Sequence, residues 1–163
     1  MGLDNMPKTY PCESLAVKDE HGSIDCKATQ EAHNCPYMNE YENDPITENL
    51  SPVYGMFGVP CWYRGKYGNQ MLEDMKRYNS NFDNDMPSDF YGNSDEGIDA
   101  DLCSEMADVM FQYMEAWSHA VHQMVKNREI TEQGKDSYIR DWLYAAWWLK
   151  FVAKFGDGSA IWY

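Results

Sequence analysis

The run from Asp136 to Phe155 constrains the fold more than any other part of the sequence. It holds three of the six tryptophans and contains neither proline nor glycine before Gly156. Such a run predicts a long C-terminal helix at the centre of the core. On a helical wheel of about 100° per residue, one side of this helix carries a stripe of mostly polar residues. Three aromatic residues fall inside that stripe: Trp147, Phe151 and Phe155. We therefore expect this helix to be covered on two sides, on one by a helix predicted at 99–126 and on the other by the cysteine-containing N-terminal lobe or a second subunit. A protein partner or a second copy of the chain is expected to bind at these three aromatic residues.

A second helix is predicted from Asp99 to Lys126, with acidic residues at its positively polarised start. The segment 127–130 forms a short turn, and Thr131 is placed to cap the next helix. A turn this short predicts an antiparallel helical hairpin. The apolar face of the second helix consists of Leu102, Met106, Val109, Met110, Tyr113, Trp117, Ala120, Val121 and Met124.

The remaining sequence divides into an irregular N-terminal lobe and a short helix. Residues 1–65 carry six of the seven prolines, and within them Ser14–Val17 and Ser23–Cys26 flank a turn at Asp19–Gly22, which predicts a small β-hairpin. Apolar residues recur at helical spacing over Tyr67–Tyr78. We expect one mostly α domain over 1–163, made of the lobe and a helical part, 66–163, that includes an acidic loop at 79–101.

The acidic loop begins like a calcium-binding EF-hand loop, with Asn81, Asp83 and Asp85 at alternate positions. The sixth position is Met86 instead of glycine, and the twelfth is Gly92 instead of glutamate. The motif therefore fails, and a solvated loop is the favoured interpretation.

The charge balance excludes several classes of partner. Asp and Glu number 27 against 13 Lys and Arg, a net charge of -14, which repels nucleic acids and anionic membranes. The start of the sequence lacks the pattern of a signal peptide, and the longest apolar run, Trp142–Leu149, is much shorter than the ~20 residues that span a bilayer. We expect a cytoplasmic protein that binds neither nucleic acid nor membrane.

Four cysteines in the N-terminal lobe are the strongest chemical signal: Cys12, Cys26, Cys35 and Cys61. A segment with no core of its own can obtain folding free energy from a metal held by four thiolates. No pair has the Cys-x-x-Cys spacing of a zinc knuckle. A structural zinc is the first hypothesis; an iron–sulfur cluster, disulfides and cysteines buried as small apolar residues stay open.

Other candidate residues give weaker signals. His33 is close enough to the cysteines to replace one thiolate, and Cys103 is predicted to lie in the core. Glu115, His119 and His122 share one helix face opposite the apolar stripe, which is typical of a solvated face. We find no pattern for nucleophilic or acid–base catalysis and favour a protein that is not an enzyme by itself.

Two resemblances add to these expectations. The segments 1–12, 24–30, 34–36, 52–58 and 61–69 are similar to a set of uncharacterised small proteins from archaeal and environmental genomes, which implies one cysteine framework and no known activity. The pattern Trp117-x-x-Ala120-Val-x-x-Met124-Val, followed by Ile130-Thr131, resembles the helix-turn-helix of the non-catalytic subunits of nitrile hydratase and thiocyanate hydrolase. The cysteine-rich metal claw of that family is absent here, so the resemblance implies at most a subunit role.

Overall fold

The structure is a computed structural model, and it describes residues 4–9, 13–34, 63–87 and 97–162. The described chain is mostly helical, as predicted, and a three-stranded sheet accompanies the helices. The helices are η1 (Glu13–Leu15), α1 (Cys26–His33), α4 (Gly65–Tyr78), α5 (Phe82–Asp85), α6 (Ala100–Gln112), α7 (Met114–Lys126) and α8 (Glu132–Phe155), and the strands are β1 (Asp4–Pro7), β2 (Tyr63–Arg64) and β3 (Ser159–Trp162).

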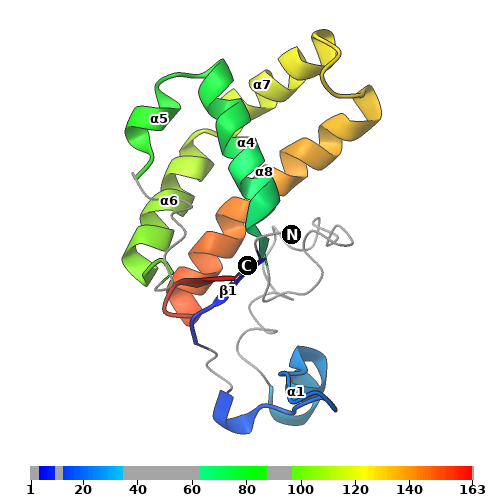
Figure 1. Cartoon of the computed structure of the whole chain (residues 1–163), viewed down its shortest axis with the longest axis vertical. Coiled ribbons are helices and arrows are strands. Elements are labelled where there is room, and N and C mark those ends of the chain that lie inside the picture. Colours follow the sequence, from blue (N-terminus) through cyan, green and yellow to red (C-terminus); the bar gives the residue numbers. More distant parts are fainter. Residues whose placement is uncertain (1–3, 10–12, 35–62, 88–96, 163) are drawn as a thin grey trace.

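The long helix α8 is the centre of the molecule, and α4, α6 and α7 pack against it (Figure 1). Thr131 caps its start, as predicted, because the Thr131 hydroxyl accepts a hydrogen bond from the Gly134 N–H at 3.1 Å. Asp99 caps α6 in the same way, accepting from the Leu102 N–H at 2.8 Å. The helices predicted at 67–78 and 136–155 are confirmed, and they correspond to α4 and α8.

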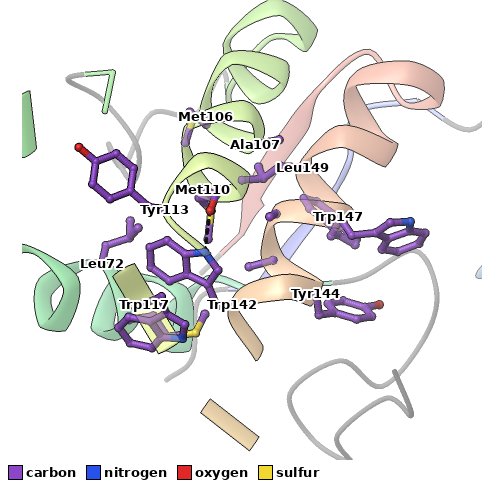
Figure 2. Close-up of a cluster of buried hydrophobic side chains, with 14 of the residues drawn as sticks. Leu72, Met106, Ala107, Met110, Tyr113, Trp117, Trp142, Tyr144, Trp147 and Leu149 are labelled. Atoms are coloured by element: carbon purple, nitrogen blue, oxygen red, sulfur yellow. Dashed lines mark hydrogen bonds between the residues drawn. The ribbon is translucent and has the colours of Figure 1, made fainter. Parts of the chain in front are cut away.

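Aromatic side chains of three elements meet in the core. The indole rings of Trp117 and Trp142 stack with centroids 4.7 Å apart, and the ring of Phe82 lies 5.5 Å from that of Trp142. All three side chains are fully buried. These contacts join α5, α7 and α8 around one cluster (Figure 2).

The prediction of one continuous helix from Asp99 to Lys126 is wrong, because the chain breaks at Tyr113 into α6 and α7. No glycine or proline lies there to cause the break. Instead, the indole N–H of Trp142 on α8 donates a hydrogen bond to the Met110 carbonyl at 2.8 Å. In a continuous helix that carbonyl would accept from the Met114 N–H. A side chain that takes a carbonyl out of the helical hydrogen-bond ladder is a known cause of a kink.

The face of α8 turned away from Trp142 is also buried. Figure 2 shows Tyr144 and Trp147 on the side opposite Met110 and Trp142. Trp147 is 3% exposed and Phe151 is 4% exposed. The rings of Trp147 and Phe151 stack at 4.9 Å, and that of Phe155 lies 5.4 Å beyond. The expectation that α8 is apolar and buried on two sides is confirmed.

The small sheet has the order β2-β1-β3 and was not predicted. Both neighbours run antiparallel to β1: Asp4 pairs with Arg64 of β2 and with Trp162 of β3. The sheet thus joins three segments that are far apart in the sequence. Gly158 permits the approach of β3 to the start of α6, because its φ is +99° and a Cβ there would lie 2.1 Å from the Ile98 carbonyl oxygen.

The expected β-hairpin at 14–26 is present only as its turn. Lys18 and Ile24 form a single antiparallel bridge around the turn, and the second strand gives way to α1 at Cys26. The Asp25 carboxylate starts this helix by accepting a hydrogen bond from the Ala28 N–H at 2.9 Å. An N-terminal helix cap at Asp25 is the signal that the sequence interpretation missed.

Candidate functional site

The four predicted metal ligands are not tested by the structure. Cys12, Cys35 and Cys61 lie outside the described residues, and Cys26 begins α1 with its backbone alone described. His33, the proposed substitute ligand, is exposed at the end of α1. Among the described residues, no group of three or more His, Cys, Asp or Glu side chains is arranged to hold a metal ion. The four-cysteine zinc site stays a prediction.

Cys103 lies in the core, as predicted. Its thiol is free and fully buried. Burial raises the pKa of this thiol to about 11. The side chain therefore stays protonated at neutral pH and acts as a small apolar group.

Residues 79–87 of the acidic segment differ from the expected solvated loop, because they contain α5 and the buried side chain of Phe82. Its carboxylates contact the protein itself. Asp83 forms an ion pair with Lys76 at 2.9 Å, and Asp85 accepts a hydrogen bond from the Tyr113 hydroxyl at 2.5 Å. Residues 88–96 lie outside the described part of the chain.

An open groove of about 620 Å³ lies where the end of α4 meets the junction of α6 and α7. Tyr78 and Asn79 line it from α4, and Gln112 and Tyr113 line it from the junction. The first turns of α7 complete the lining with polar side chains that alternate with alanines. These α7 residues are Glu115, Ala116, His119, Ala120 and Gln123.

Hydrogen bonds hold both tyrosines of the groove. The Tyr78 hydroxyl donates to the Glu129 carboxylate at 2.6 Å, and the Tyr113 hydroxyl donates to Asp85. Each of these bonds raises the pKa of its tyrosine. Arg77 forms an ion pair with the same Glu129 carboxylate, so the end of α4 is tied to the turn between α7 and α8.

The predicted solvated face of α7 is confirmed, since Glu115, His119 and His122 are all exposed. His122 is not among the described lining residues, and its Nδ1 donates a hydrogen bond to the Ser118 carbonyl at 2.6 Å. Glu115 and His119, by contrast, line the groove. The sequence pattern did not reveal this because the opposite wall comes from α4.

The carboxylate of Asp141 on α8 is an unusual group because it is buried. Asp141 is 8% exposed, and its Oδ1 atom has no hydrogen-bond partner among the described residues. Burial raises the pKa of this carboxyl to about 6, against the opposing effects of Arg140 and Ser137. Such a group is a recognised indicator of function, although buried carboxylates also occur for structural reasons.

Comparison of the chain with protein-family models, with curated proteins and with solved structures finds no match. The site is therefore interpreted from its own geometry. Within the described residues, no helix combines the length and apolar character required to cross a membrane.

Proposed function

We propose that this protein is a non-enzymatic interaction or accessory protein of the cytoplasm that presents the groove between α4 and the α6–α7 junction to a protein partner. The observation that carries this proposal is the groove itself. It is open to solvent and has walls from two separate parts of the chain. Most of its polar side chains, those of Tyr78, Gln112, Glu115, His119 and Gln123, lie on helices, and helices hold side chains more precisely than loops do.

The groove is organised before any partner binds. On the α4 side, Tyr78 is held by Glu129 and by the Asn127 side-chain amide, which donates to its hydroxyl oxygen at 3.2 Å. On the other side, Tyr113 is 9% exposed, and its ring packs edge-on against Phe82 at 5.1 Å. A surface that is rigid in the free protein loses less conformational entropy on binding.

The groove is a better interaction surface than the aromatic face of α8. A partner at Trp147, Phe151 and Phe155 was the expectation from the sequence, but the first two of these side chains are already buried within one chain. Binding there would require the chain to open. The groove needs no such rearrangement, so we place the partner there.

The proposal includes a structural zinc bound by Cys12, Cys26, Cys35 and Cys61. The support is chemical: these four thiols lie in a proline-rich segment, and four thiolates around zinc supply the folding free energy that such a segment lacks. The alternative is an iron–sulfur cluster on the same cysteines, in a redox protein or in a non-catalytic subunit of a metalloenzyme.

Metal analysis of the purified protein tests this part of the proposal. We expect about one zinc ion per chain, because four thiolates complete a tetrahedral zinc site. Four thiols should react with a thiol reagent only after a chelator removes the metal, and the buried Cys103 only after unfolding. A brown protein with visible absorbance would replace zinc by an iron–sulfur cluster, and four reactive thiols without metal would exclude both.

Blocking the groove tests the interaction. Gln112→Trp places an indole at an exposed position of the groove lining, whereas Gln133→Trp makes the same change at an exposed position of α8 outside the lining. We expect Gln112→Trp to abolish the co-purification of a partner that the unmodified chain and Gln133→Trp both retain. Circular dichroism melting should show both variants folded. Equal retention by both folded variants would contradict a role for the groove.

A further inference from the structure

Building on the proposed function, we propose that the groove recognises an arginine-bearing segment of the partner, with the guanidinium group bound by the Glu115 carboxylate and by tyrosine hydroxyl oxygens. The proposal commits to one chemical class of ligand, a cation with several N–H donors. It follows from the hydrogen-bonding state of the groove and from its charge.

The two tyrosine hydroxyls offer acceptors to a ligand and no donors. A tyrosine hydroxyl has one proton. That of Tyr78 goes to Glu129 at 2.6 Å, and that of Tyr113 goes to Asp85 at 2.5 Å. The same bonds raise the pKa of both tyrosines, so the hydroxyls stay protonated and keep these protons at neutral pH. The Tyr78 oxygen already accepts a hydrogen bond from the Asn127 side-chain amide at 3.2 Å, so it has one lone pair left, and the Tyr113 oxygen also keeps lone-pair capacity. This favours a ligand that donates.

The charge of the groove also favours a cationic ligand. Glu115 is exposed, lines the groove and has no ion-pair partner among the described residues. Among the described residues that line this groove, none is a lysine or an arginine. The chain as a whole carries a net charge of -14, which attracts a cationic segment over a distance and raises its association rate.

A guanidinium group fits this arrangement better than the other cations. It is planar, carries five N–H donors and stacks on aromatic rings, so it can donate to more than one acceptor at a time. An ammonium group on a flexible stem matches such a fixed set of acceptors less well. A divalent metal ion takes several oxygen or nitrogen ligands, and within the described part of the lining only Glu115 and His119 are carboxylate or imidazole ligands.

The test is a titration of the full-length protein, followed by NMR, with acetyl-Gly-Arg-Gly-Arg-Gly-amide. The counterpart containing citrulline has the same shape without the charge. We expect saturable shifts at the side-chain amides of Gln112 and Gln123 with the arginine peptide and none with citrulline. Glu115→Gln should weaken binding about tenfold, as expected for loss of a charge-assisted hydrogen bond.

The matched control is Glu105→Gln, which removes the same charge from an exposed position of α6 outside the groove lining. We expect it to change the affinity by less than about twofold, as is typical of a remote surface charge. Equal weakening by both variants would reduce the effect to general attraction by an acidic protein and would overturn the proposal. So would equal binding of the citrulline peptide.

The proposed function and this inference can fail separately. If Gln112→Trp abolishes partner capture while the arginine peptide shows no preference over citrulline, the groove is an interaction site and the ligand class is wrong. If the partner is retained by Gln112→Trp and the arginine peptide does not bind, both are wrong.

Discussion

Replacement of Trp142 by alanine is expected to lower the free energy of unfolding by about 3–5 kcal/mol, as found for large aromatic residues in well-packed cores. The side chain is fully buried, and its ring contacts those of Trp117 and Phe82. Removing it leaves a cavity where α5, α7 and α8 meet. Urea denaturation followed by circular dichroism measures the change, and a loss below about 1 kcal/mol would contradict this account of the core.

Trp142→Phe separates packing from hydrogen bonding at the same position. It keeps an aromatic ring and removes the indole N–H that donates to the Met110 carbonyl. We expect a smaller loss of about 1–3 kcal/mol, from a lost buried hydrogen bond and reduced packing. If the indole causes the break between α6 and α7, the Met114 N–H gains the Met110 carbonyl in this variant and becomes better protected from hydrogen exchange. Unchanged protection of the Met114 N–H would show that the Trp142 indole does not cause the break.

Replacement of Asp141 by asparagine is expected to stabilise the protein above pH 6 and to remove part of its pH dependence. The pKa of the folded carboxyl is about 6, above its ordinary value of 3.8. The folded state therefore binds this proton more tightly than the unfolded state, and stability falls as pH rises from about 4 to about 6. The shift corresponds to at most about 3 kcal/mol, which asparagine should recover because it remains uncharged.

The measurement is the difference in unfolding free energy between Asp141→Asn and the unmodified chain from pH 4 to pH 8. A difference is needed because other groups titrate in the same range. The pKa of Asp74 on α4 is raised, mainly by burial. The pKa of Glu129 is lowered, mainly by the hydrogen bond from Tyr78. Asp136→Asn, at an exposed position of α8, is the control and should change stability by less than about 0.5 kcal/mol. A difference that does not vary with pH would show that Asp141 is not the titrating group.

The sequence predicted those features that depend on neighbouring residues. The apolar spacing of α4 and α8 and the cap at Thr131 are local signals, and the structure confirms each of them. The break at Tyr113 was missed because the hydrogen bond made there, from the Trp142 indole to the Met110 carbonyl, joins residues 32 positions apart. No periodic pattern in one helix reports on a side chain from another.

The sheet and the groove were missed for the same physical reason. β2 contains two residues and β1 contains four, too few for an alternating apolar pattern to be recognised. In the groove, the exposed face of α7 was predicted, but the Tyr78 wall comes from α4. The sequence supplied the polar groups of one wall and gave no indication of the other.

The pairing of β1 with β3 also sets the order in which the molecule can be completed during synthesis. Residues 4–7 are synthesised before the described helices, whereas their partners, 159–162, are synthesised after them. Until then, the β1 backbone lacks the β3 edge of the sheet, whereas α4 and α6 can already form. Closure of the sheet is therefore a late event in folding, and a chain truncated before residue 159 would lack the strand that pairs with residues 4–7.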